Sequence, residues 1–248
     1  MNKPKLFPLG ETAVTVDFGN RISAELNDRV LSLAKRLDEK PFAGFIETVP
    51  AYSSLTVFYD VFKIRTNNPK LQTAFDFVCA EIEKALLEMS DKSRSESRLM
   101  KIPICFDREF ASDLDFVAAE KNLSSDEVIE IFLAETYRVF MLGFLPGFAY
   151  MGEVSEKIAT ARKSNPRVRV PLGSVGIAGI QTGIYSLESP GGWQIIGRTP
   201  LKMFDRQNEP PTLLQAGDQV QFYSIDKTSF TELKQNQSEM GNPKWVIE

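Results

Sequence analysis

The chain has 248 residues, and its 33 acidic and 29 basic side chains give a net charge of −4 at pH 7. A hydrophobic share of 43% and a charged share of 25% are typical of a soluble globular protein. The acidic balance argues against a general nucleic-acid or anionic-membrane binder, because both need basic surfaces. The sequence contains no histidine, which excludes Ser-His-Asp and Cys-His catalysis and histidine-ligated zinc.

The N-terminal sequence and the two cysteines both favour a cytoplasmic location. The N-terminal stretch MNKPKLFPLG lacks the apolar core of a signal peptide, and no apolar run approaches the roughly 20 residues that span a bilayer. Cys79 and Cys105 lie in apolar stretches, which predicts two buried free thiols in a reducing compartment. We therefore expect a cytoplasmic protein that has no metal site and binds neither nucleic acid nor membranes.

Residues 1–89 predict a small α+β domain. Strand-like alternation in TAVTVDFG, GFIETVP and SLTVFYD is interrupted by two amphipathic helical patterns. The first helical face runs from Ile22 to Leu37 and the second from Leu71 to Leu86. The resulting β-α-β-β-α order predicts a ferredoxin-like α/β sandwich. The polar, low-complexity stretch 90–97 (SDKSRSES) predicts a linker.

Residues 98–230 predict a β domain with two short helices. RLMKIPICFD is a strand candidate, and helices are expected over Asp113–Lys121 and Ser125–Leu133, the second with a capping box of Ser124 and Glu127. From residue 137 onward, short β-rich runs alternate with Gly/Pro turns, which is typical of a closed or sandwiched β domain. Residues 231–248 are expected to form a tail or a short closing element.

The stretch from Asn165 to Trp193 (NPRVRVPLGSVGIAGIQTGIYSLESPGGW) differs from the rest of the chain. It holds six of the 15 glycines, and no acidic residue occurs from Lys157 through Leu187. Strand alternation in RVRV places Arg167 and Arg169 on one face and the two valines on the other. Two guanidinium groups without a carboxylate nearby in the sequence suit a carboxylate or phosphate ligand, although a solvated basic face explains the pattern as well.

Three further motifs each allow a structural and a functional interpretation. GSVGIAG (173–179) lacks the Gly-Lys-Ser/Thr of a P-loop, so tight corners in a barrel explain its glycines better than a nucleotide loop. SPGGW predicts a type II turn with positive φ at Gly191, which leaves Gly192 for close approach of a ligand and Trp193 for the core. GFLPGFAYMG (143–152) is dense in aromatic residues, which fill a core or line an apolar partner surface.

These motifs carry a resemblance to a known family. GFLPGF, VPLGSVGIAG, QTGIY and SPGGWQIIG resemble motifs of the KipI family, whose members are also called 5-oxoprolinase B subunits or allophanate hydrolase subunit 1. The resemblance extends from LGETAVTVDFG through LLQAGDQVQF. It implies an N-terminal α+β domain followed by a C-terminal cyclophilin-like β-barrel, in agreement with the pattern analysis.

The resemblance also implies a subunit that has no activity alone. With a KipA-like partner (the C subunit of 5-oxoprolinase) and a LamB/YcsF-like partner (its A subunit), family members form an ATP-dependent enzyme that opens 5-oxo-L-proline to L-glutamate. ATP with Mg would belong to the assembled complex, and no cofactor would be bound tightly by this chain alone. Two alternatives stay open, namely a KipI-type regulatory protein that inhibits a sensor histidine kinase and an allophanate- or urea-type carboxyltransferase subunit.

By the same resemblance, the glycine-rich stretch would form much of the face that meets substrate or partner. Arg167 and Arg169 would supply positive charge, and backbone N–H groups at Gly191 and Gly192 would approach an anion. The remaining substrate-side candidates are Ser174, Gln181, Tyr185 and Trp193. The candidates for a partner surface are Phe144, Leu145, Pro146 and Phe148. No catalytic residue is assigned from the sequence.

Two positions depart from the family pattern. Phe132 and Leu133 stand where many members have His followed by Ser or Thr, so a mechanism that uses that histidine cannot operate in this chain. We expect Phe132 to replace it with core packing. Ser186 stands where many relatives have proline.

Overall fold

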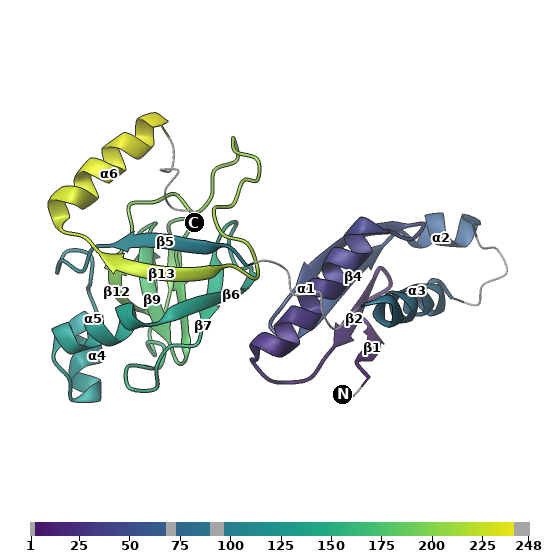
Figure 1. Ribbon diagram of the computed structural model, residues 1–248, viewed down its shortest axis with the longest axis horizontal. Coiled ribbons are helices and arrows are strands. Elements are labelled where there is room, and N and C mark those ends of the chain that lie inside the picture. The colour runs from purple at the N-terminus through teal and green to yellow at the C-terminus, as the bar shows by residue number, and fades with distance from the viewer. Residues whose placement is uncertain (1–2, 68–72, 90–96, 241–248) are drawn as a thin grey trace. The chain divides into compact units, whose positions relative to one another are not determined.

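The structure is a computed structural model that describes residues 3–67, 73–89 and 97–240. The mixed α/β chain separates into two compact units, residues 1–96 and 97–248 (Figure 1). Most of the predicted linker, the end of the predicted tail from residue 241, and Leu71 in the second predicted helix lie outside the described residues. Within the described ranges, no helix is both long and apolar enough to cross a membrane.

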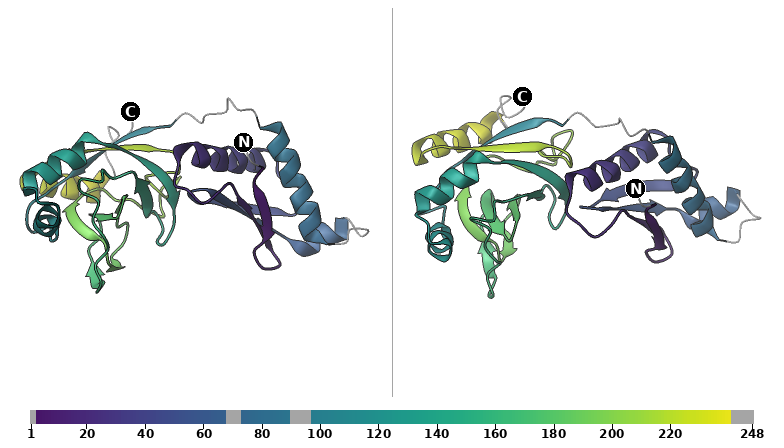
Figure 2. Two further views of the ribbon diagram at one scale, coloured as in Figure 1. Left: turned by 90° about the horizontal axis from the view of Figure 1, so that it is seen from below. Right: turned by 60° about the horizontal axis from the view of Figure 1, so that its bottom comes forward.

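The first unit is a four-stranded antiparallel sheet covered on one face by two long helices (Figure 2). Its strands, in the spatial order β1-β2-β4-β3, are β1 (Lys5–Pro8), β2 (Ala13–Asp17), β3 (Phe45–Pro50) and β4 (Ser54–Tyr59). Helices α1 (Ala24–Glu39) and α3 (Ala74–Glu88) pack on the sheet and on each other, and the short α2 (Val61–Asn67) follows β4.

The predicted patterns account for the core of this unit. Val14 and Val16 of β2 are fully buried, whereas Thr15 and Asp17 between and after them are only partly buried. Helix α1 buries one face at helical spacing, which comprises Leu26, Val30, Leu33 and Leu37.

One edge of the sheet differs from the ferredoxin-like expectation. The strand beside β2 is β1, which precedes the first helix, whereas the ferredoxin-like order takes its last strand from after the second helix. Strand β1 reaches this edge through a local hairpin, in which Leu9 N–H donates to Ala13 O at 2.9 Å. Strand β1, which is close to β2 in the sequence, therefore occupies the edge that a strand after the second helix takes in the ferredoxin-like order.

The second unit is built on a seven-stranded sheet that curls into a half-barrel. The strand order is β12-β9-β10-β7-β6-β13-β5, and only the β13–β5 pair is parallel. The strands of this sheet are β5 (Leu99–Ile104), β6 (Thr136–Leu142), β7 (Ala149–Gly152), β9 (Ser174–Ala178), β10 (Gln181–Ile184), β12 (Gln194–Arg198) and β13 (Gln219–Ser224). Strands β8 (Arg167–Val170) and β11 (Ser189–Gly191) form a separate two-stranded ribbon.

The two edges of the curled sheet meet at one point. Cys105, directly after β5, exchanges backbone hydrogen bonds of 2.8 and 3.0 Å with Arg198 at the end of β12. Gly197 permits this approach, because a Cβ at that position would lie 2.7 Å from the Ile104 side chain. Cys105 is a buried free thiol and Cys79 a half-buried one, so neither forms a disulfide, as predicted.

Two short helices, α4 (Leu114–Lys121) and α5 (Ser125–Ala134), share the hydrophobic core of the half-barrel. The predicted capping box of Ser124 and Glu127 is present at the start of α5. Phe132 is fully buried, and its ring lies 5.0 Å from that of Tyr137 and 5.1 Å from that of Phe222. Phe132 therefore belongs to the core, as predicted.

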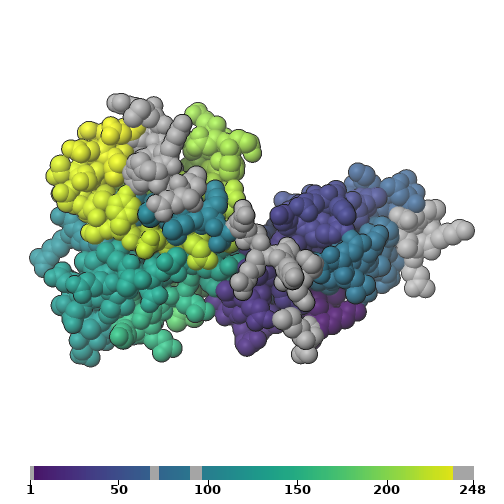
Figure 3. All heavy atoms as spheres, in the orientation of Figure 1, coloured from purple at the N-terminus to yellow at the C-terminus, as the bar shows by residue number. Residues whose placement is uncertain are grey.

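The C-terminal segment is helical where a tail or a short closing element was expected from residue 231. Helix α6 spans Lys227–Met240 and lies on the surface of the second unit, shown in yellow in Figure 3. Asp226 Oδ1 accepts the N–H of Ser229 at 2.7 Å at the first turn, and the buried ring of Phe230 stacks on Phe110 with centroids 4.4 Å apart. The sequence gives little sign of this helix, because Phe230, Leu233 and Met240 are the apolar residues of an otherwise polar segment and are too few to show a helical period.

Candidate functional site

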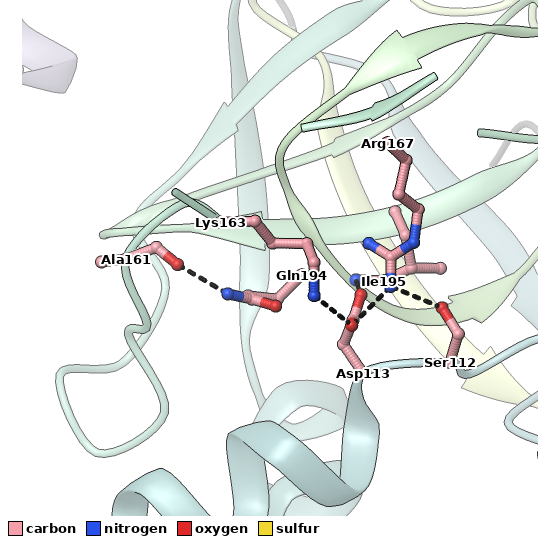
Figure 4. Close-up of polar contacts among 7 residues, drawn as sticks. All are labelled: Ser112, Asp113, Ala161, Lys163, Arg167, Gln194 and Ile195. Carbon is pink, nitrogen blue, oxygen red and sulfur yellow. Dashed lines mark hydrogen bonds and ion pairs between the residues drawn. The ribbon is translucent and has the colours of Figure 1, made fainter. Parts of the chain in front are cut away.

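Asp113 is the centre of a buried ion-pair cluster at the start of α4 (Figure 4). It occupies the N-cap position of that helix, yet its carboxylate makes no capping hydrogen bond. Its Oδ1 accepts from Arg167 Nη2 at 2.5 Å and from Lys163 Nζ at 3.1 Å. Its Oδ2 accepts the backbone N–H of Ile195 at 2.7 Å. One carboxylate thus joins α4, the loop before β8, β8 itself and β12.

The cluster keeps Asp113 ionised and carries an excess of positive charge. Burial by itself raises the pKa of Asp113, but hydrogen bonds from Arg167, the Ile195 N–H and Lys163 outweigh burial and hold the pKa below its ordinary value of 3.8. One negative charge faces two cations, so the two cations are only partly neutralised. With both oxygens occupied, Asp113 is suited to positioning these cations rather than to carrying a proton.

A cavity of about 460 Å³ adjoins the cluster. Phe116 and Glu120 of α4 form one part of its wall, and its remaining polar side chains are Thr160, Arg162, Lys163, Ser164, Asn165 and Gln194. Arg162 and Lys163 place two positive charges on this wall against the single exposed carboxylate of Glu120. The cavity is therefore suited to a small anion.

Backbone hydrogen bonds hold the loop that carries these cations. Thr160 O accepts the N–H of Gly179 at 2.8 Å, and the Lys163 N–H donates to Gly192 O at 2.7 Å. Between them, Ala161 O accepts from Gln194 Nε2 at 2.9 Å (Figure 4). Three bonds over four residues give the wall a defined shape before any ligand arrives.

Two buried polar atoms of the site are unpaired within the described part of the chain. They are Gln194 Oε1 and Arg167 Nη1. The orientation of the Gln194 amide follows from its bond to Ala161 O, because a carbonyl only accepts and must face the NH₂ group. A buried polar atom without a hydrogen-bond partner destabilises the fold. A ligand or water that forms a hydrogen bond with it therefore binds more favourably.

The structure separates the two arginines that the sequence grouped together. Arg167 lies in the Asp113 cluster, whereas Arg169 is largely exposed and pairs with Glu188 at 2.6 Å across the β8–β11 ribbon. Val168 is 88% exposed, so only Val170 of the expected valine face is buried. Both carboxylates lie outside the acid-free stretch, since Asp113 is remote in the sequence and Glu188 directly follows Leu187. The absence of acidic residues from the stretch therefore does not leave its arginines without carboxylates in the structure.

The SPGG segment is a strand and not the predicted type II turn. Ser189–Gly191 form β11, and neither Gly191 nor Gly192 has a positive φ. Gly191 is needed because a Cβ there would lie 2.1 Å from the Tyr185 hydroxyl oxygen. A Cβ at Gly192 would make ordinary contacts of 3.5 Å or more. The close approach predicted for Gly192 therefore occurs at Gly191, and its neighbour is a side chain of the same chain.

Tyr185 and Trp193 belong to a buried aromatic cluster next to the cations. The ring of Phe148 lies 5.4 Å from that of Tyr185 and 5.5 Å from that of Trp193. The Arg162 guanidinium lies 5.5 Å from the centre of the Trp193 ring. Burial raises the pKa of Tyr185, while its hydrogen bond with the Trp193 backbone and the charges of Arg162 and Arg167 oppose this. Tyr185, Trp193 and Arg167 thus lie in one neighbourhood.

The other predicted substrate-side residues lie away from the cavity wall. Ser174 is buried at the start of β9, where it pairs with Arg198 of β12. Gln181 begins β10, where it pairs with Gly152 of β7. Neither residue lines the cavity, whose neutral polar side chains are Thr160, Ser164, Asn165 and Gln194.

The predicted partner surface is only partly a surface. Phe144 is 61% exposed, Pro146 is exposed and Leu145 is half-buried, so these three remain available to a partner. Phe148 is buried in the aromatic cluster and is removed from that set. The turn in GFLPGF thus directs Phe144 outward and Phe148 inward. A high density of aromatic residues in the sequence does not indicate which of them are exposed.

Sequence reasoning missed Asp113 and Gln194. The sequence indicated Asp113 only as the start of a helix. It does not reveal whether the carboxylate of an N-cap aspartate caps the helix or binds elsewhere. Gln194 stands in a strand whose pattern indicates core. Nothing in the local sequence indicates that one end of its amide is left unpaired.

Comparisons with known proteins agree with this architecture. Residues 4–214 match the family described as carboxyltransferase domain, subdomain C and D. The chain is similar to the 5-oxoprolinase B subunit of Bacillus subtilis (strain 168), with 44% identity over 92% of this chain and 95% of that protein. It is 37% identical to the 5-oxoprolinase B subunit of Escherichia coli O157:H7, over 90% of this chain and 96% of that protein.

A solved structure extends the likeness to the fold. The crystal structure of TTHA0988 superposes with a TM-score of 0.73 at 34% identity, over 86% of this chain and 40% of that chain. The protein thus spans less than half of this longer relative. The matched family and the curated relatives together confirm the family expected from the motifs: the chain belongs to the carboxyltransferase-domain family, and within it to the group of 5-oxoprolinase B subunits.

Proposed function

We propose that this chain is the B subunit of an ATP-dependent 5-oxoprolinase that converts 5-oxo-L-proline, ATP and water to L-glutamate, ADP and phosphate. The observation that carries the proposal is the 44% identity to a 5-oxoprolinase B subunit, spread over 95% of that protein. The partners we propose are a KipA-like C subunit and a LamB/YcsF-like A subunit. The chain acts in the cytoplasm, and its two units correspond to a variant of a ferredoxin-like domain, with β1 at the edge beside β2, and to a cyclophilin-like domain.

The cavity beside Asp113 is the proposed substrate site of this chain. The substrate 5-oxoproline is a small anion, and its carboxylate would face the cations Arg162 and Lys163 on the cavity wall. Asp113 holds Lys163 and Arg167 in place through two ion pairs and partly neutralises their charges. Opening of the lactam develops negative charge on its carbonyl oxygen, and cations already held in place would stabilise this charge without reorganising.

ATP and Mg do not fit the residues of this site. Mg takes carboxylate oxygens, yet both oxygens of Asp113 are occupied and Glu120 is the single carboxylate on the cavity wall. The loop of residues 173–179 supplies no phosphate cradle, because Ser174–Ala178 form a buried strand. We therefore propose that the partner subunits hold ATP and Mg, and that this chain contributes the lactam site alone.

The carboxyltransferase alternative has one observation in its favour, the name of the matched family. It is weaker than the hydrolase interpretation, because urea amidolyase of Lachancea kluyveri is 26% identical and this chain covers 14% of it. A regulatory role on a sensor kinase would leave the cations of the cavity without a ligand, so we rank it behind both.

Reconstitution tests the proposal. The purified chain alone should release no glutamate from 5-oxoproline, and ATP-dependent release should appear when the KipA-like and LamB/YcsF-like partners are added. Turnover by the chain alone would overturn its role as a dependent subunit. A complex that assembles from all three proteins and stays inactive toward 5-oxoproline but carboxylates a urea-like amide would support the carboxyltransferase alternative.

A further inference from the structure

The Gln194 carboxamide carries a buried hydrogen-bond acceptor without a donor, on a residue that lines the cavity. The residue is 3% exposed, begins β12 and lines the cavity. Its Nε2 is held by Ala161 O at 2.9 Å, so the amide cannot turn without losing that bond (Figure 4). Its Oε1 has no partner within the described ranges. The side chain is therefore fixed with one acceptor left for a ligand.

The same wall holds positive charge. Lys163 is tied to Asp113 at 3.1 Å, and Arg162 lies over Trp193 with no carboxylate partner among the residues the structure describes. Phe116, half exposed on α4, adds an apolar plate within 5.9 Å of Lys163 Nζ. A ligand that satisfies the whole wall combines an anionic group, a short apolar body and one N–H or O–H donor.

We propose that Gln194 determines specificity by accepting the lactam N–H of a carboxylate-bearing cyclic amide. The inference rests on the proposed function, since 5-oxoproline carries one ring N–H and one carboxylate on a small apolar ring. Arg162 and Lys163 bind the carboxylate, and Gln194 Oε1 accepts from the ring nitrogen. An analogue without the N–H leaves this buried oxygen unpaired, and such sites discriminate strongly.

The test uses the reconstituted complex and three probes: 5-oxoproline, its N-methyl derivative and the corresponding γ-lactone carboxylate. Gln194→Met keeps the length of the side chain and removes the acceptor. The matched control is Thr182→Val, which removes a buried hydrogen bond to Gly176 O in the same sheet but lies off the cavity wall. Melting temperatures of both variants identify effects that arise only from lost stability.

We expect wild type to bind 5-oxoproline at least about 30-fold more tightly than either analogue, as measured by KM and by inhibition constants. In Gln194→Met this preference should fall to within about threefold, with kcat changed less than KM, whereas Thr182→Val should keep the full preference. An active complex in which Gln194→Met retains the wild-type preference overturns the inference and leaves the proposed function standing.

An inactive wild-type complex would overturn the proposed function, and a second measurement then decides the inference. The side-chain amide signals of Gln194 are followed by NMR in the full chain during titration with each probe. Shifts with 5-oxoproline but not with the N-methyl compound support a site that recognises the N–H. Equal shifts with both, or none with either, mean that only water fills the acceptor, and the inference fails.

Discussion

Asp113 and Arg167 are 54 positions apart in the sequence and form a direct ion pair of 2.5 Å in the structure. The pair lies between α4 and the β8–β11 ribbon, and its carboxylate also binds Lys163 on the cavity wall. This relationship changes how the basic stretch is interpreted. A segment without acidic residues in its sequence is organised around an acidic residue from elsewhere.

The two arginines of β8 should therefore differ sharply. Arg167→Ala should lower the free energy of unfolding by about 1.5–3 kcal/mol, because it removes hydrogen bonds to a buried carboxylate. Activity of the complex should also fall, because Asp113 loses a partner that helps to hold it beside Lys163; about 1.5–3 kcal/mol on the activation barrier corresponds to about ten- to a hundredfold. Arg169→Ala should change stability by less than about 0.5 kcal/mol, since its pair with Glu188 is exposed. Urea denaturation and steady-state assays measure both quantities.

Lysine at position 167 is the control for charge alone. Arg167→Lys should restore only part of the loss, because the shorter lysine side chain does not place its ammonium where Arg167 Nη2 donates to both Ser112 Oγ and Asp113. Equal effects of the alanine variants at 167 and 169 would contradict the separation of the two residues.

Asp113 should make stability depend on pH in the acid range. Its pKa is lower in the folded chain than the ordinary 3.8, so folding favours the ionised form. The stabilisation is complete above about pH 5 and is lost as pH falls through the folded pKa. Asp113→Asn should be destabilised by about 3–5 kcal/mol at pH 7, since two cations lose their buried partner.

Denaturation of wild type and Asp113→Asn from pH 3 to pH 7 measures this dependence. The gap between their free energies of unfolding should stay constant from pH 7 to about pH 5 and should narrow below that, toward pH 3. A gap that stays constant down to pH 3 would show that the carboxylate is not stabilised by its partners.

The two glycines of SPGG should respond differently to alanine. Gly191→Ala places a Cβ against the Tyr185 hydroxyl and should cost about 1–3 kcal/mol through overpacking. Gly192→Ala meets only ordinary contacts and should be close to neutral. Adding Tyr185→Phe to Gly191→Ala should recover part of the loss, because the nearest clashing atom is removed. Thermal melts of wild type and these variants test this, and a larger cost at Gly192 would refute it.

Ser186 should be a site of easy stabilisation. Its hydroxyl is buried and has no hydrogen-bond partner within the described chain. Ser186→Ala removes an unsatisfied group and should raise the free energy of unfolding by about 1 kcal/mol. Ser189→Ala is the matched control, since that buried hydroxyl donates to Pro190 O at 3.3 Å and its loss should bring no gain. Destabilisation by Ser186→Ala in chemical denaturation would show that the hydroxyl has a partner.

The periodicity of apolar residues was sufficient to predict which faces of the local elements are buried. Burial alternates in β2 and repeats at helical spacing in α1, as the apolar pattern predicted, because a single element determines which of its side chains face inward. The capping box of Ser124 and Glu127 is equally local, and so is the burial of Phe132, which follows the same helical face as Val128. The strand order was not accessible, since β1 competes with any later strand for the edge beside β2.

The candidate site was decided by tertiary structure alone. Arg167 and Arg169 are equivalent in strand alternation, and only the position of α4 gives one of them Asp113 and leaves the other in solvent. Likewise Gln194 looks like one more strand residue, and its unpaired oxygen exists because Ala161, 33 positions earlier, takes the other end of the amide. The spacing of residues along the chain determines which face of a strand or helix a side chain occupies. The packing of the elements around the core determines which other side chains it then contacts.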